Sequence, residues 1–217
     1  MRHGTPAYPG NPATTEPNCR ARGKRTKGGV ASAVVHGYLL TGADDLYVAY
    51  HDQEWGRPLH GEAEVLEKLC LEGAQAGLSW ITILRKRARY REVFEGFDPY
   101  VVASFDDRHV ELLVSDAGIV RNRAKIISAI DNARATVTLL DSGESLDALC
   151  WSFQPPPRVT RRTERDELSV TCPEAIALSK ELKRRGFGFV GPTTMYAFMQ
   201  SAGLVDDHID GCWVAPR

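Results

Sequence analysis

Helix start and stop signals recur along this 217-residue chain, and they constrain its fold more than any other feature. Ser79 is a plausible N-cap for "WITILRKRARYREVF", which the turn residues "GFDP" end, and Asp106 or Asp107 can cap "RHVELLVSD". "PEAIALSKELKRR" and "PTTMYAFMQSA" each begin with proline and end at glycine. Apolar residues recur at helical spacing over 62–76 and 123–140. Because no stretch alternates over enough residues to indicate a sheet, we predict an all-α fold.

The charges are unevenly distributed along the chain. Residues 1–30 carry six Lys and Arg against Glu16 alone, whereas the whole chain has 27 basic and 28 acidic residues. The first 30 residues are also rich in Pro, Gly and Thr and contain no apolar signal-peptide core. We therefore predict a disordered, basic extension over residues 1–36 and one folded domain over 37–217. The net acidic charge of this domain excludes a globally basic nucleic-acid binder but leaves local basic patches open.

The apolar and cysteine content limits where the protein works. No apolar run approaches the ~18 residues that a membrane helix needs, so we expect no membrane association. The five cysteines show no CxxC spacing, and an odd number without a signal peptide indicates a reducing compartment. We expect a cytoplasmic protein, and no feature of the sequence indicates an obligate protein partner.

The stretch "LLVSDAGIVRNRAKIISAI", within about residues 110–130, is predicted to form two helices joined by a sharp turn at Gly118. The amides that begin the second helix, beside Arg121, Arg123 and Lys125, are typical of a site for a DNA backbone phosphate. Helix pairs without a ligand also contain glycine and flanking basic residues. A plain structural corner is therefore the alternative at this point.

One carboxylate, Glu72, lies among apolar and small residues in "LCLEGAQAGLSW". Ionised carboxylates are almost never fully buried unless they have a partner. Glu72 therefore either lies at the solvent edge of its helix or faces a functional site. Four aromatic residues are near it in the sequence: Tyr47, Tyr50, Trp55 and Trp80. Aromatic residues at such spacing form either part of the core or a platform for a ligand.

His208 and Cys212 in "DHIDGC" stand four residues apart near the C-terminus. On a helix, an imidazole and a thiolate at this spacing share a face and suit a tetrahedral zinc site, but two ligands are only half a site. A structural pair without metal is the alternative. A zinc hydrolase centre built on "HDQE", residues 51–54, is disfavoured because the helix lacks the paired His-x-x-x-His.

Four segments resemble the bacterial DNA-3-methyladenine glycosylase I family in order and spacing. They are "DLYVAYHDQEWGRP", "LCLEGAQAGLSWITILRKR", "DAGIVRNRAKI" and "GFGFVGPTTMYAFMQSAGLVDDHIDGC", and they span about residues 44–212. The resemblance implies the helix-hairpin-helix glycosylase fold, a structural zinc, and excision of 3-methyladenine from alkylated double-stranded DNA by hydrolysis of the N-glycosidic bond. An inactive or non-enzymatic DNA-binding relative is the alternative.

The resemblance also implies roles for individual residues. Glu72 matches the family's pocket carboxylate, to which we assign the catalytic role. Tyr50 and Trp80 match the aromatic residues that stack on the base, and Trp55 and Tyr47 lie close to them in the sequence.

The turn "QAGLSW" resembles the family's DNA-penetrating segment, in which Leu78, after Gly77, is the wedge that fills the base stack. Within the C-terminal segment of about residues 204–213, His208 and Cys212 match two zinc ligands. His51 matches a third.

The chain departs from the family before residue 44. The family has a Cys-x-Trp pair upstream of its Tyr-His, whose cysteine is the fourth zinc ligand and whose tryptophan walls the base site. Here Tyr38 and Leu40 take those places, and Cys19 is the only upstream cysteine. We therefore expect zinc to bind weakly, with Cys19 or water as the fourth ligand, or not at all.

Overall fold

A computed structural model describes residues 44–163, 169–210, 212 and 214. Within these residues the chain is helical, with no strand and one isolated β-bridge, between Arg162 and Ile209. The predicted all-α fold is confirmed. The predicted extension over residues 1–36, and with it Cys19, Tyr38 and Leu40, lies outside the described residues. The helices are α1 (Asp45–Gln53), α2 (Glu62–Gln75), α3 (Trp80–Val93), a 3₁₀ turn η3 (Glu95–Phe97), α4 (Pro99–Ala103), α5 (Asp107–Ser115), α6 (Arg123–Asp141), α7 (Leu146–Trp151), α8 (Pro173–Arg184) and α9 (Pro192–Ser201).

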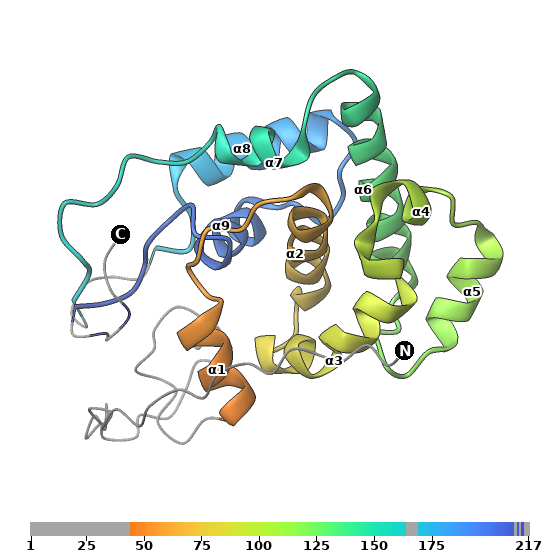
Figure 1. The fold of residues 1–217 in the computed structure, drawn as a ribbon, viewed down its shortest axis with the longest axis horizontal. Coiled ribbons are helices and arrows are strands. Elements are labelled where there is room, and N and C mark those ends of the chain that lie inside the picture. The colour runs from red at the N-terminus through yellow and green to blue at the C-terminus, as the bar shows by residue number, and fades with distance from the viewer. Residues whose placement is uncertain (1–43, 164–168, 211, 213, 215–217) are drawn as a thin grey trace, which may run out of the picture.

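Helix α2 is the centre of the molecule. It packs against α3, α6, α7 and α9, and Figure 1 shows it between α9 and α6, with α3 beneath it. Every side chain from Lys68 to Ala74 is buried, so the second half of α2 is covered on all sides. A helix that is surrounded in this way is expected to be apolar all round. The two charged residues that it buries, Lys68 and Glu72, therefore need a specific explanation.

The remaining helices form two groups around α2. Figure 1 shows α4, α5 and the long α6 on one side, and α7, α8 and α9 on the other. Helix α6 packs on α4, α5 and α2, which joins the hairpin formed by α5 and α6 to the central helix. Helix α1 packs against α3. Among the described residues, no helix is long and apolar enough to cross a membrane.

The capping residues explain where several helices begin. The side chain of Asp106 accepts from the backbone of His109 at the start of α5, as predicted, and Asn122 and Ser145 cap α6 and α7 in the same way. Ser79 occupies the predicted N-cap position of α3, but its Oγ lies 2.9 Å from Thr82 Oγ1 and makes no bond to the helix backbone. Helices α1 and α4 were not predicted.

Candidate functional site

Glu72 is 3% exposed on the covered face of α2, which excludes a position at the solvent edge of the helix. Ser201 Oγ, at the end of α9, donates a 2.7 Å hydrogen bond to Glu72 Oε1. The second oxygen, Oε2, is buried and has no hydrogen-bond partner among the described residues. Buried acceptors without a partner are rare because they lose their hydration without replacement. Oε2 of Glu72 is therefore a buried acceptor that a ligand could satisfy.

Burial raises the pKa of Glu72 to about 7, although the positive charge of Lys68 and the hydrogen bond from Ser201 both act to lower it. A carboxyl group with such a pKa exchanges its proton near neutral pH. A positive ligand beside Oε2 would favour the ionised form. The environment of Glu72 is thus suited to a cationic partner.

Two aromatic rings stand beside this carboxylate. Tyr50, on α1, and Trp80, the first residue of α3, are 3% and 1% exposed, and their ring centroids lie 5.4 Å apart at 46°. Tyr47 is half-buried one turn earlier on α1, and burial together with the negative charge of Glu72 raises its pKa to about 12. The structure thus brings together four residues predicted from the sequence, on three helices that meet at one point.

The contact between Tyr50 and Trp80 limits how a base can bind. Two rings in direct contact leave no space for a base between them. A base could therefore enter between them only if the rings separate. The Nε1 atom of Trp80 is also buried without a partner among the described residues. It is a donor, whereas Oε2 of Glu72 is an acceptor.

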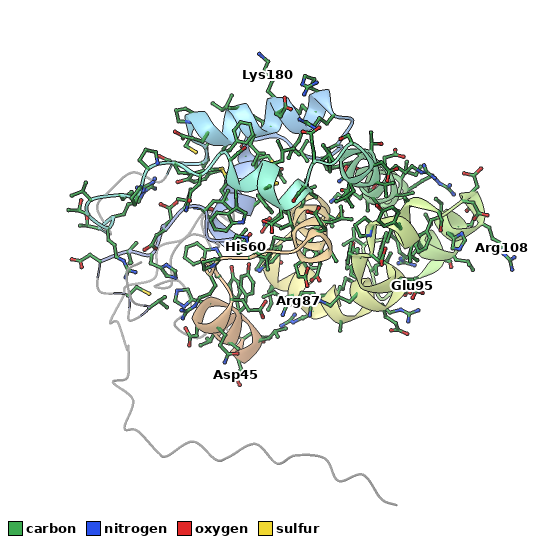
Figure 2. The ribbon with its side chains drawn as sticks, turned by 45° about the horizontal axis from the view of Figure 1, so that its top comes forward. Asp45, His60, Arg87, Glu95, Arg108 and Lys180 are labelled. Carbon is green, nitrogen blue, oxygen red and sulfur yellow. The ribbon has the colours of Figure 1, made fainter. Side chains whose placement is uncertain are left out.

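Lys68 is a member of this cluster that the sequence reasoning missed. It precedes Glu72 by one helical turn, is 8% exposed, and donates from Nζ to the Tyr50 hydroxyl at 3.3 Å. Its only sequence signal is the i, i+4 spacing from Glu72, which places both side chains on one face of α2. On the far side of Tyr50, Arg87 forms an ion pair with Glu54; Figure 2 labels Arg87 on α3.

Trp55 lies beside the metal-ligand candidates. It is 2% exposed, and its ring centroid lies 4.6 Å from that of His208 and 5.9 Å from that of His51. Its predicted role in base binding stays a prediction. The observed contacts assign it to the packing around the two histidines.

The turn between α2 and α3 presents Leu78, which is 41% exposed, to solvent. Gly77 precedes it with φ +80°, a left-handed conformation that glycine adopts without strain. Leu78 N donates to Gln75 O at 2.6 Å, which closes the turn. Leu78 is thus an exposed apolar side chain on a closed turn, and its role as a wedge stays a prediction.

The hairpin between α5 and α6 differs from the prediction at Gly118. Its backbone φ is not positive, so the turn does not need glycine for that reason. A Cβ at this position would lie 2.5 Å from Arg89 Cγ, so the absence of a side chain allows Arg89 to pack there. Its amide donates to Asp116 Oδ1 at 2.6 Å and is therefore not free to bind a phosphate. The predicted DNA-binding role of Gly118 stays a prediction.

The three basic residues after Gly118 have different surroundings. Lys125 Nζ donates to Ala74 O at 2.8 Å and Ala76 O at 2.6 Å, which ties α6 to the end of α2. Arg123 Nη2 donates to both carboxylate oxygens of Glu111, at 2.6 and 2.7 Å. Arg121 is exposed and forms no hydrogen bond or ion pair with a described residue. Of the three, Arg121 is thus the one whose charge is unused.

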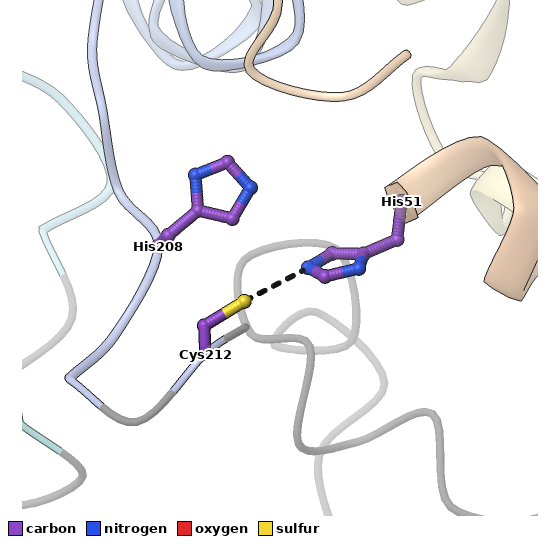
Figure 3. A group of neighbouring side chains, drawn as sticks. All are labelled: His51, His208 and Cys212. Atoms are coloured by element: carbon purple, nitrogen blue, oxygen red, sulfur yellow. Dashed lines mark hydrogen bonds between the residues drawn. The ribbon is translucent and has the colours of Figure 1, made fainter. Parts of the chain in front are cut away.

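Three metal-ligating side chains meet at the far end of α1. One ligand atom each from His51, His208 and Cys212 lies within 4.8 Å of the others, and Cys212 Sγ lies 3.7 Å from His51 Nε2. Figure 3 shows His51 at the end of α1 facing Cys212 and His208 on the C-terminal segment. These are soft and borderline donors of the kind that zinc prefers.

The surroundings of the two imidazoles suit a metal. Asp52 Oδ1 lies 2.8 Å from His51 Nδ1, and Asp206 Oδ1 lies 2.7 Å from His208 Nδ1. Although burial opposes it, the hydrogen bonds from His208 lower the pKa of Asp206 to about 2, so Asp206 is ionised. Carboxylates that hold Nδ1 leave Nε2 to act as the ligand. The buried Nε2 of His208 has no partner among the described residues, and the donor set therefore fits zinc.

The C-terminal segment that carries these ligands is not a helix. From Ala202 to Cys212 the described residues form turns and irregular chain, so the prediction that His208 and Cys212 share a helix face is wrong. Buried Asp207 fixes the segment instead. Its Oδ2 accepts from Tyr196 and Gln200, each at 2.6 Å, and its Oδ1 lies 3.1 Å from Arg158 and 3.3 Å from Arg162.

A helical hairpin with an unused arginine, an exposed apolar turn, and a buried carboxylate beside aromatic rings are the parts that a base-excising enzyme of DNA requires. The chain belongs to the methyladenine glycosylase family, whose sequence model matches residues 40–215. It is 50% identical to DNA-3-methyladenine glycosylase 1 of Escherichia coli (strain K12) over 174 residues, which cover 80% of this chain and 93% of the relative. It is 44% identical to DNA-3-methyladenine glycosylase of Haemophilus influenzae over 172 residues, 79% of this chain and 93% of that protein.

Solved structures have the same fold. A crystal structure of 3-methyladenine DNA glycosylase I matches with a TM-score of 0.77 and 48% identity, over 80% of this chain and 96% of the other. The enzyme from Staphylococcus aureus, described as showing the structural basis of 3-methyladenine recognition, matches with a TM-score of 0.77 at 31% identity, over 87% and 99%. The predicted helix-hairpin-helix glycosylase fold is confirmed.

Proposed function

We propose that this chain is a DNA-3-methyladenine glycosylase, which removes 3-methyladenine from alkylated double-stranded DNA by hydrolysing the N-glycosidic bond. The observation that carries the proposal is the buried Oε2 of Glu72, which has no hydrogen-bond partner among the described residues, in the same cluster as the rings of Tyr50 and Trp80. The relatives named above for this activity cover most of the chain. We propose that it acts in the bacterial cytosol, where its DNA substrate is found, and the free thiols of Cys70 and Cys150 suit a reducing compartment.

The charge of the substrate explains this arrangement. Methylation at N3 makes the base a cation and a good leaving group, so the enzyme needs little general acid catalysis. Glu72 Oε2 can accept a hydrogen bond from the exocyclic amine, and a charge-assisted bond of this kind is stronger than a neutral one. The faces of Tyr50 and Trp80 favour a cation over a neutral base by about 0.5–2 kcal/mol for each contact. The cluster therefore selects the damaged base by its charge.

The other elements act on the DNA. The target nucleotide must leave the helix, which costs a few kcal/mol of stacking and pairing energy. Leu78, on the closed turn after α2, takes the place of the extruded base. Arg121 at the hairpin binds a backbone phosphate, while Arg123 and Lys125 keep the contacts with protein that they have in the free chain.

Release of free 3-methyladenine from methylated duplex DNA tests this proposal. The Glu72→Gln variant should release the base about 10²-fold more slowly, because it keeps the shape of the side chain and removes its charge. Glu64→Gln, at an exposed position of the same helix, is the matched control and should retain full activity. A parent chain that binds DNA without releasing base would support the inactive relative. Equal rates for parent and Glu72→Gln would remove Glu72 from the reaction.

We further propose that His51, His208 and Cys212 hold a structural zinc ion. Bound zinc would join the end of α1 to the C-terminal segment, which is the tethering role of a structural metal site. It would close a chain loop of about 160 residues, which restricts the unfolded chain and stabilises the fold. The fourth ligand is a water molecule or Cys19, and affinity should be modest in consequence.

Cobalt replacement gives a test that does not depend on activity. A Co²⁺-loaded chain should show the charge-transfer absorption of a thiolate ligand, which Cys212→Ser should abolish and Cys172→Ser should leave intact. Chelation of the zinc form should lower its Tm by several degrees. An absent thiolate band together with a Tm that does not respond to chelation would contradict the site.

A further inference from the structure

The ammonium group of Lys68 is buried next to Glu72 without an ion-pair partner in the described part of the chain. Among the described residues, its only hydrogen-bond partner is the Tyr50 hydroxyl. Burial lowers the pKa of Lys68, while the negative charges of Glu72 and Glu54 raise it again. Arg87 also faces this group and lowers the pKa, and Glu67 raises it. Lysine side chains are almost never fully buried without an ion-pair partner. Here the nearby carboxylates and the faces of two aromatic rings stabilise the ammonium group instead.

The same ammonium group lies over the aromatic rings on which, under the proposed function, the substrate base would stack. Lys68 Nζ lies 5.0 Å from the centroid of the Tyr50 ring and 5.5 Å from that of the Trp80 ring, within the range of cation–π attraction. Glu72 and Lys68 together make the empty site close to neutral. Without Lys68, the site with Glu72 ionised would carry one negative charge and would hold a cationic base more tightly.

We propose that the positive charge of Lys68 repels the cationic base and so weakens its binding in the ground state. This repulsion is relieved as the glycosidic bond breaks. This inference rests on the proposed function. When the C1′–N9 bond breaks, its electron pair goes to the base, which leaves as neutral 3-methyladenine. The positive charge moves to the sugar, where water adds at C1′ and gives up a proton to solvent. The repulsion with Lys68 therefore falls during the reaction.

The effect acts on the rate and on product release. Interactions that are less unfavourable in the transition state than in the bound substrate raise kcat. Repulsion between unit charges a few Å apart at a protein site is large enough for at least a tenfold effect. The product, 3-methyladenine, is neutral, and the charges of Glu72 and Lys68 balance each other. No net charge therefore holds the product in the site. Glu72 gives the site its preference for the damaged base, and Lys68, as a positioning residue, limits how tightly that base is held.

The Lys68→Met variant tests this inference, because methionine preserves the unbranched shape and removes the charge. Two probes separate charge from shape at pH 8: neutral 3-methyladenine, and the 3,9-dimethyladeninium cation, in which a methyl group replaces the sugar. The variant should bind the cation about tenfold more tightly relative to the neutral base. On methylated DNA, KM and kcat should both fall about tenfold. Lys68→Arg, which keeps the charge, should restore both values toward those of the parent.

Other outcomes would overturn the inference. An unchanged ratio of the two affinities would show that Lys68 carries no effective charge in the site. Weaker binding of both probes with a lower Tm would show that it only supports Tyr50. Because the probe measurement needs binding alone, it reports on Lys68 even if the parent releases no base, in which case the proposed function fails separately.

Discussion

The Glu72 cluster and the metal-ligand cluster share helix α1 but are held in place by different forces. Glu72, Tyr50 and Trp80 stand on three helices whose apolar faces pack together, so burial fixes their positions. His208 and Cys212 stand on irregular chain, which is fixed by the ion and hydrogen-bond network of Asp207. The comparison teaches that a functional site on helices is as stable as the core, whereas one on irregular chain depends on a few polar contacts.

The largest effect should come from breaking that network. Asp207→Asn leaves Arg158 and Arg162 without their buried counter-charge, which should lower the free energy of unfolding by about 3 kcal/mol. Urea unfolding of the variant, with Asp210→Asn at an exposed position as the control, measures this. Affinity for Co²⁺ should fall as well, because the ligand segment loses its anchor. A variant as stable as the control would show that metal or packing alone holds the segment.

The next effect concerns the carboxylate of the helix-borne cluster. The folded-state pKa of Glu72, about 7, lies above the ordinary value of 4.5, so folding favours the protonated form. The raised pKa contributes fully to the free energy of unfolding below pH 4.5, and this contribution is lost as the pH rises through about 7. Glu72→Gln should therefore match the parent at pH 4.5 and exceed it at pH 8 by on the order of 1 kcal/mol. Urea unfolding at both pH values measures the difference, and parallel profiles would contradict it.

The same titration should appear in the activity of the parent chain. Since the ionised form of Glu72 attracts the cationic base, kcat/KM should rise with pH through an apparent pKa near 7. Lys68→Met should move this midpoint to higher pH, because the positive charge of Lys68 favours the carboxylate. The pH profile of base release from methylated DNA measures both. A flat profile between pH 6 and 8 would show that another group limits the reaction.

The smallest effect separates two basic residues of the hairpin. Arg121→Met should reduce the slope of log K against log salt concentration by about 0.9, the loss of one phosphate contact, for every DNA sequence alike. Arg123→Met is the control, because its guanidinium already pairs with Glu111. DNA binding measured from low to moderate salt gives both slopes. If only Arg123→Met lowers the slope, the two residues exchange roles on binding.

Local patterns predicted the elements that hold the Glu72 cluster. Apolar spacing and caps placed α2, α3, α5, α6, α8 and α9 within one or two residues of their observed ends. Helix α1 was read only as an aromatic segment, and α4 is five residues long, too short for a periodic pattern. Short elements of this kind are fixed by packing against neighbours, which a local pattern does not contain.

Contacts between segments that are far apart in the sequence could not be predicted from local sequence patterns. Nothing in the sequence connects Ser201 with Glu72, since their hydrogen bond joins positions 129 residues apart. The i, i+4 spacing of His208 and Cys212 indicated a helix that does not form, because the buried pairs of Asp207 with Arg158 and Arg162 hold this segment as irregular chain. The family resemblance assigned both as ligands independently of that spacing.

The two hydrogen bonds from Lys125 to the carbonyls of Ala74 and Ala76 join the start of α6 to the turn that carries Leu78. Under the proposed function, this link would set a distance along the DNA between the hairpin and the wedge. When Arg121 binds a phosphate and Leu78 enters the stack, the number of nucleotides between the two is set by the protein. The enzyme would thus test each base pair at a constant offset from the phosphate that it grips, and each one-nucleotide step along the duplex would present one new pair for inspection.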